Sequence, residues 1–151
     1  MTFIRQATPD DVPTILPLVD SYWDFEEISG FEQERVAAQL TCLLSNPNLG
    51  AGWIAIVDGV AVGYLLAVHL FSLEYLGLTA EIDEFFVLPS QRGNGIGAKL
   101  LTVAESEFVQ RGCTNMSLQL SRGNNSARDF YHSLGYADRP GYELLDKSLN
   151  C

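Results

Sequence analysis

The apolar positions of this chain recur with two different periods, which predict short strands and amphipathic helices. Residues 2–7 are expected to form a short first strand. The next segment begins with Thr8, Pro9 and two acids, which are typical of a helix start, and its apolar residues then recur at helical spacing. Apolar residues at the same spacing recur over 32–45. We therefore expect one strand followed by two helices.

The middle of the chain predicts a hairpin. Asp58-Gly59 separates the apolar runs 53–57 and 60–70, and this dipeptide favours a tight turn between two strands. The remaining elements are expected to be strands at 80–87, 115–120 and 142–147 and helices at 96–110 and 126–134. The resulting order is β-α-α-β-β-β-α-β-α-β. It predicts an α/β fold, a mixed sheet with helices on both faces, although the order alone allows several topologies.

The composition is that of a folded protein without a membrane segment. Of the 151 residues 47% are hydrophobic, yet no run of 18 apolar residues occurs, and the N-terminus lacks the long apolar stretch of a signal peptide. No linker interrupts the pattern, so we expect residues 1–151 to form a single, soluble domain in the cytoplasm, with no membrane partner.

Charge and cysteine content argue against further classes of partner and site. The formal net charge of −10 argues against nucleic acid as a partner. The negative charge suits a cationic ligand, although the requirement for solubility explains this charge equally well. Cys42, Cys113 and Cys151 are odd in number, widely spaced and not accompanied by clustered histidines. We expect reduced thiols, and neither a disulfide framework nor a metal site.

The most informative segment is a strand that runs into a basic, glycine-rich turn and then a helix, over residues 85–98. Gly93, Gly95 and Gly97 remove the Cβ atoms from the turn, so its backbone can approach a ligand closely. The helix start offers unpaired N–H groups and a positive dipole end, and Arg92 adds a permanent charge. The segment predicts a phosphorylated ligand. A plain structural turn is the alternative.

The spacing of this turn fits neither of two common nucleotide loops. A Walker loop requires Gly-Lys-Ser/Thr, whereas Gly97 is followed by Ala98 and Lys99. A dinucleotide fingerprint fits only loosely, and it would lie too late in a chain too short for a doubled nucleotide fold.

The spacing Arg-x-x-Gly-x-Gly instead resembles the pyrophosphate loop of the GNAT superfamily of N-acetyltransferases. A second segment, Asn124 to Tyr136, is similar to that family's Asn-x-x-Ala-x-x-Phe-Tyr-x-x-x-Gly-Phe/Tyr motif. The two motifs stand in the family's order, and the expected elements match its fold along nearly the whole chain. The resemblance implies the GNAT acyl-CoA N-acyltransferase fold, a mixed, mostly antiparallel sheet flanked by helices.

The resemblance also implies acetyl-CoA as co-substrate and assigns its contacts. It assigns the pantetheine arm to Phe85, Phe86 and Val87, the pyrophosphate to Arg92, Gly93, Asn94, Gly95, Ile96, Gly97 and Ala98, and the far end of the molecule to Asn124 and Ala127. It assigns protonation of the leaving thiolate to Tyr131, whose hydroxyl carries a proton at neutral pH. Core packing is the other explanation for this tyrosine.

The acceptor side is marked by three acids, Glu81, Asp83 and Glu84, on the strand that precedes the turn. Alternation places the first two on one face of the sheet and Glu84 on the other. This stretch resembles spermidine/spermine and related diamine N-acetyltransferases, in which a pair of acids meets the amine, although the order here is Asp-Glu rather than Glu-Asp. Asp83 or Glu84 would act as base through water. A solvated strand end is the alternative.

Further aromatic and histidine residues are open to two explanations. Trp23, Phe25 and Phe31 alternate with acids between the first two helices, where the resemblance places the acceptor site. They form either a lip for a cationic amine or an apolar cover over the core. His69 and His132 receive no catalytic role.

The resemblance leaves the acceptor and the assembly open. A small, cationic, polyamine-like amine is expected as the second substrate. Aminoglycosides, aminoalkylphosphonates and protein amines are alternatives, as is a non-catalytic acyl-CoA-binding regulator. A homodimer is compatible with the resemblance.

Overall fold

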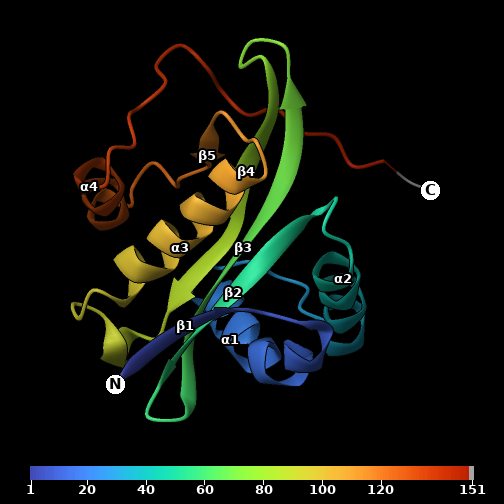
Figure 1. Cartoon of the computed structure of the whole chain (residues 1–151), viewed down its shortest axis with the longest axis vertical. Helices are drawn as coiled ribbons and strands as arrows, with labels where there is room; N and C mark the ends of the chain where they lie inside the picture. The colour runs from blue at the N-terminus through green and yellow to red at the C-terminus, as the bar shows by residue number, and fades with distance from the viewer. Residues whose placement is uncertain (150–151) are drawn as a thin grey trace. The chain divides into compact units, whose positions relative to one another are not determined.

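The computed structural model describes residues 1–149, in two compact units, Met1–Gln119 and Leu120–Cys151, which are described separately (Figure 1). The first unit contains β1 (Thr2–Gln6), a 3-10 turn (Pro9–Asp11), α1 (Val12–Phe25), α2 (Gln33–Ser45), β2 (Gly50–Val57), β3 (Val60–Ser72), β4 (Gly77–Val87), a 3-10 turn (Pro89–Gln91), α3 (Ile96–Gln110) and β5 (Met116–Leu118). The second unit contains α4 (Asn125–Ser133).

The first unit is built on one sheet with the strand order β1-β2-β3-β4-β5. Neighbouring strands are antiparallel except for β4 and β5, which run parallel. The expected hairpin joins β2 to β3, with both Asp58 (φ 50°) and Gly59 (φ 82°) in the left-handed region. The β4–β5 pairing covers only Ala80–Ile82 of β4.

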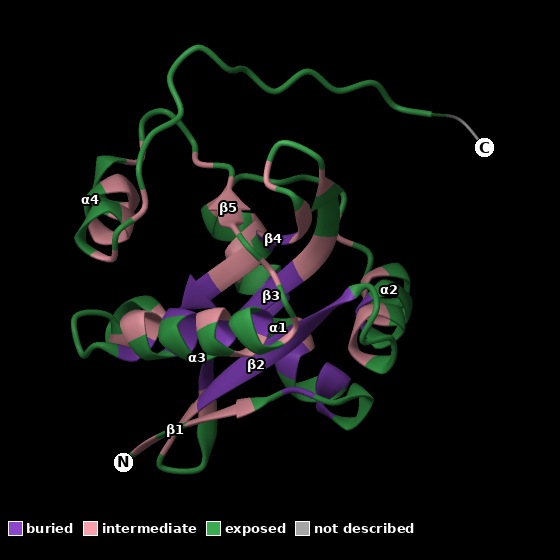
Figure 2. Ribbon diagram, turned by 45° about the horizontal axis from the view of Figure 1, so that its top comes forward, coloured by how far each residue is buried: buried purple, intermediate pink, exposed green. Residues whose placement is uncertain are grey.

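Helices cover both faces of this sheet, as predicted. On one face α1 and α2 pack over Tyr64, Leu66 and Phe86 of β3 and β4 (Figure 1). On the other face α3 packs over the sheet, where Phe108 meets Trp53 of β2 at 5.6 Å between ring centroids. Buried residues concentrate along the central strands (Figure 2).

The last predicted strand, 142–147, is wrong, because this stretch belongs to no helix or strand of the second unit. A strand needs a partner to satisfy its backbone hydrogen bonds, and no strand among the described residues pairs with this stretch. Leu145 is 89% exposed as a result. The predicted strand 115–120 is shorter than expected, since β5 ends at Leu118.

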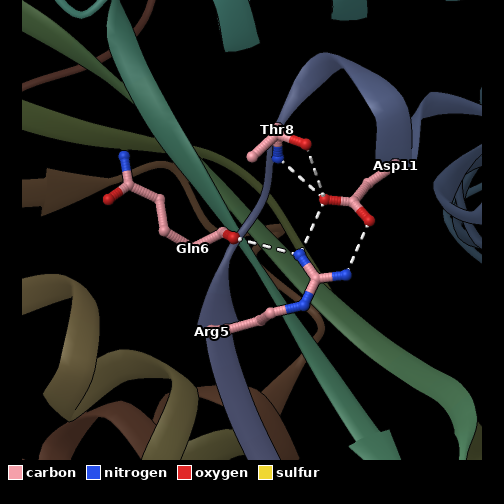
Figure 3. Close-up of polar contacts among 4 residues, drawn as sticks. All are labelled: Arg5, Gln6, Thr8 and Asp11. Carbon is pink, nitrogen blue, oxygen red and sulfur yellow. Dashed lines mark hydrogen bonds and ion pairs between the residues drawn. The ribbon is translucent and has the colours of Figure 1, made fainter.

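A partly buried ion pair fixes the start of α1 to β1 (Figure 3). The two terminal nitrogens of Arg5 donate to the two oxygens of Asp11 at 2.8 and 2.7 Å, and the Thr8 amide donates to the same carboxylate at 2.8 Å. Asp11 is buried. The hydrogen bond from Arg5 is the main reason that its pKa is lowered to about 2.

This ion pair predicts a pH-dependent stability. Because the pKa of Asp11 is lower in the folded state, its contribution is complete above the unfolded value of about 3.9 and is lost as pH falls toward about 2. We expect Asp11→Asn to lower the free energy of unfolding by about 2 kcal/mol at neutral pH and by much less near pH 2. Urea titrations at several pH values measure this difference. The exposed neighbour provides the control, and an equal, pH-independent loss in Asp10→Asn would contradict the account.

Candidate active site

The glycine-rich turn between β4 and α3 presents a row of unpaired backbone donors. Gly95 is the residue before the first turn of α3 and has a φ of 79°, and Gly93 has a φ of 82°. The N–H groups from Gly95 to Ala98 form no hydrogen bond within residues 1–149, and the first helical bond runs from the Lys99 amide to the Gly95 carbonyl at 3.1 Å. Four successive donors at a helix start can hold an anion.

Arg92 stands beside these donors with its side chain fixed. Its Nε donates to the Val87 carbonyl at 2.8 Å, and its guanidinium carbon lies 4.7 Å from the Phe25 ring centroid and 5.3 Å from that of Phe86. No carboxylate within the described part of the chain pairs with this guanidinium. No described carboxylate therefore compensates the charge of Arg92 through an ion pair. Asn94 donates from its side chain to the Gln91 carbonyl at 3.3 Å.

The end of β4 has one unpaired edge. Phe85, Phe86 and Val87 pair with β3 on one side, but β5 pairs with β4 only as far as Ile82. From Asp83 onward no strand of residues 1–149 pairs with the other edge, so a ligand with an extended amide backbone can bind there as a strand would. Among the acceptors of this stretch, the Val87 carbonyl is already engaged by Arg92.

A cavity of about 550 Å³ lies between α1, α2 and the strands β3 and β4. It is lined by Val19, Trp23, Gly30, Glu32, Arg35, Val36, Ala38, Gln39, Leu40, Leu43, Leu66, Asp83 and Glu84. Most of these residues are apolar. The charged ones are three acids and one arginine, and Arg35 lies 3.3 Å from Glu32 in an exposed ion pair.

Glu84 is hydrogen-bonded through both of its carboxylate oxygens. The Tyr64 hydroxyl donates to Oε1 and the Trp23 indole nitrogen to Oε2, each at 2.8 Å. Burial raises the pKa of Glu84, and the two hydrogen bonds oppose this rise. Tyr64 could not be singled out from the sequence, because an isolated tyrosine in an apolar strand gives no signal of a partner on β4.

Asp83 lines the same cavity as Glu84, which corrects the prediction that the two acids lie on opposite faces. In the register between the strands, Ile82 is opposite Ala67 and Glu84 is opposite Leu66, so Asp83 is the extra residue of a β-bulge. A bulge interrupts the alternation of side chains between faces. Desolvation by surrounding protein raises the pKa of Asp83, although its side chain still reaches solvent.

The remaining acid of β4 and the aromatic residues singled out from the sequence make contacts of their own. Glu81 accepts a hydrogen bond from the Gln119 side chain at 3.0 Å. Phe31 packs edge-on against Trp23 at 5.5 Å. Phe25 contacts Arg92 rather than the cavity. The aromatic segment therefore contributes to both the acid pair and the basic turn.

The second unit carries the remaining predicted residues. Asn124 caps α4, and its side-chain oxygen accepts from the Ala127 amide at 3.1 Å. The ring of Tyr131 is half-buried and lies 5.3 Å from that of Phe130 and 5.6 Å from that of Tyr136. His132 pairs with Asp138 at 2.8 Å.

Three further properties concern residues 1–149 only. Cys42 and Cys113 have free thiols, and Cys151 lies outside the described residues. No group of three or more histidine, cysteine or acidic side chains converges in a way that could hold a metal ion. None of the described helices is both long and apolar enough to cross a membrane.

Comparisons with known proteins assign this arrangement to a family. The model of the Acetyltransferase (GNAT) family matches residues 15–136. An uncharacterized N-acetyltransferase of Archaeoglobus fulgidus is 36% identical over 132 residues, which cover 86% of this chain and 89% of the relative. The aminoalkylphosphonate N-acetyltransferase of Salmonella typhimurium is 31% identical, with 88% and 83% covered.

Solved structures share the fold. An aminoglycoside N-acetyltransferase in complex with CoA superposes with a TM-score of 0.83 at 22% identity, over all of this chain and 96% of the other. The chain belongs to the GNAT acetyltransferase family, has its fold and is an N-acetyltransferase.

Proposed function

We propose that this single-domain enzyme transfers the acetyl group of acetyl-CoA to the primary amine of a small, cationic, polyamine-like acceptor. The observation that carries the proposal is the junction at the end of β4. There the edge of β4 that no described strand adjoins leads directly into the α3 start, whose first amides have no hydrogen-bond partner among residues 1–149. An extended chain with amide groups that ends in a pyrophosphate matches these two features in order.

Most of the residues proposed to contact acetyl-CoA lie on the edge of β4 or at the start of α3. Phe85, Phe86 and Val87 would pair through their backbone with the pantetheine arm, and the amides over 93–98 with the pyrophosphate. Arg92, uncompensated by any described carboxylate, supports an anion at this end of the turn. Asn124 and Ala127 would contact the far end of the cofactor. Their capping bond supports a defined helix start there.

The assignment of the amine acceptor rests on the cavity that Asp83 and Glu84 both line. An aliphatic primary amine has a pKa near 10.4, so it arrives as an ammonium ion. Asp83 and Glu84 have no cationic partner among residues 1–149, which favours an ammonium between them. Tyr131 would protonate the thiolate that leaves. A cytoplasmic location and a homodimer belong to the same proposal.

A second acceptor class has one specific observation in its favour. Arg35 lines the cavity together with the acids, and a phosphonate needs such a cation. The Salmonella relative is named for aminoalkylphosphonates. However, Arg35 is already paired with Glu32, so the cavity carries an excess of negative charge, and the cationic amine remains the first candidate.

The proposed acetyl-CoA site is tested by measuring thermal stability in the presence of ligands. Acetyl-CoA and coenzyme A should each raise the melting temperature, by an amount that grows with their concentration, because a ligand that binds only the folded state stabilises it by mass action. ATP and NAD serve as controls, since each carries phosphates without the pantetheine arm. A rise with NAD and none with acetyl-CoA would overturn the cofactor assignment.

A further inference from the structure

The two acids of the cavity differ in how the protein holds them. Glu84 accepts one hydrogen bond on each oxygen, from Trp23 on α1 and from Tyr64 on β3. Asp83, at the bulge, has no hydrogen bond or ion pair to any residue of the described chain. One carboxylate is fixed in position, while the other has its lone pairs available.

The donors to Glu84 are neutral, so they fix the carboxylate without cancelling its charge. Tyr64 has 0% exposed surface, and burial raises its pKa, so its hydroxyl stays protonated and remains a donor. The indole of Trp23 is a donor at every pH. Because the two donors come from different elements, the carboxylate is held from two directions. An anion that is fixed and uncompensated is suited to anchoring a cation.

We propose that Trp23 and Tyr64 are positioning residues, which hold Glu84 as the anchor for the acceptor's ammonium group, and that Asp83 takes the ammonium proton. This inference rests on the proposed function and assigns separate roles to the two acids. In the reaction, one N–H proton of the ammonium passes to the Asp83 carboxylate, directly or through a water molecule. The free amine then forms a bond to the thioester carbonyl carbon, the carbon–sulfur bond breaks, and the thiolate receives a proton from Tyr131. The nitrogen loses its second proton as the amide forms, and this proton returns to the Tyr131 oxygen through water.

The surroundings of the two carboxylates agree with this division. Desolvation raises the pKa of Asp83, and its oxygens have no hydrogen bond within the described chain, so they are open to a proton. Burial raises the pKa of Glu84 as well, but its two hydrogen bonds favour the charged form and oppose this rise. The other titratable or charged groups near Glu84 are Tyr22 on α1 and the pair formed by Glu32 and Arg35 at the start of α2.

The test compares Trp23→Phe and Tyr64→Phe, which each remove one donor to Glu84. Without that donor the pKa of Glu84 rises, so Glu84 becomes neutral at a higher pH and no longer attracts an ammonium. With putrescine as the probe, we expect the KM to rise about tenfold at the acidic end of the pH range, the loss expected when one hydrogen bond to a charged group is removed, and to approach the wild-type value as the pH rises. Isothermal calorimetry of putrescine over the same pH range measures the anchor without turnover.

Trp53→Phe is the matched control, because Trp53 is the chain's second tryptophan and packs in the core against Phe108. It should lower thermal stability and leave the pH profile unchanged. If all three variants lose stability and none changes the pH dependence of putrescine binding, Trp23 and Tyr64 have a structural role only, and the inference is overturned.

The division between the acids is tested by a second pair of variants. Asp83→Asn should lower kcat by about 10²–10⁴, the usual contribution of a general base, with a much smaller change in KM. Glu84→Gln should mainly raise the KM for putrescine. The reverse pattern would overturn the assignment.

The failure of this inference can be distinguished from that of the proposed function. If the wild-type protein neither binds nor acetylates any amine, both are overturned. If the wild-type protein acetylates amines and the variants behave like it, only this inference is overturned.

Discussion

Replacing Tyr131 with phenylalanine should lower kcat by about 10²–10⁴ and leave the affinity for acetyl-CoA unchanged, as expected when a general acid is removed. A thiolate that leaves at neutral pH takes up a proton, because a thiol has a pKa of about 8.5, and a tyrosine hydroxyl carries its proton at that pH. The substitution keeps the ring that contacts Phe130 and Tyr136, so α4 should fold normally. Stopped-flow measurement of coenzyme A release under single-turnover conditions isolates the chemical step.

Phe130→Leu is a useful control for this experiment, since it alters the same aromatic contact without touching a hydroxyl. An unchanged single-turnover rate in Tyr131→Phe would remove this residue from the mechanism. A loss of acetyl-CoA affinity together with the rate would indicate a packing role in its place.

Replacing Gly95 with leucine should lower the affinity for acetyl-CoA by about 100-fold, the loss expected when two hydrogen bonds to a charged group are removed. No atom of the described protein lies within 4 Å of the position that a Cβ would take, so the new side chain meets no protein atom and extends beside the unpaired amides. The left-handed backbone at this position, φ 79°, adds a stability cost of about 1–2 kcal/mol.

Gly59→Leu is the control for the loss of stability that a left-handed backbone causes at a residue other than glycine. Gly59 has a φ of 82° and equally open surroundings, but it lies in the β2–β3 turn. Both variants should lose similar stability, and only Gly95→Leu should lose acetyl-CoA binding in calorimetry. Equal binding in the two variants would show that the glycine at 95 serves the turn alone.

Elements with strong local signals were predictable from the sequence. The helix expected at 96–110 has those bounds in the structure, because a glycine-rich start, a helical apolar period and a terminal Arg111-Gly112 mark it from both ends. The hairpin at Asp58-Gly59 was equally clear. The stretch 142–147 has no partner strand among the described residues, and a local pattern does not reveal whether a partner exists.

The acid pair shows what a sequence leaves undetermined. The hypothesis that Asp83 and Glu84 meet the acceptor came from their position before the glycine turn and from the resemblance, but their orientation depends on a bulge that the sequence of the strand does not indicate. The bond from Trp23 to Glu84 joins residues 61 positions apart. Such pairs depend on how α1 packs over β4, which the fold determines and the local sequence does not.

The most direct test of the account is coenzyme A release from acetyl-CoA across a panel of amines. Putrescine, spermidine, an aminoglycoside, aminoethylphosphonate and a peptide with a free N-terminus represent the candidate classes. We predict that a small polycationic amine gives the largest kcat/KM, and that this value falls as salt is raised, because exposed charges are screened beyond about 8 Å at physiological ionic strength. A preference for aminoethylphosphonate would contradict the acceptor assignment, and release that no amine accelerates would contradict the proposed acetyl transfer itself.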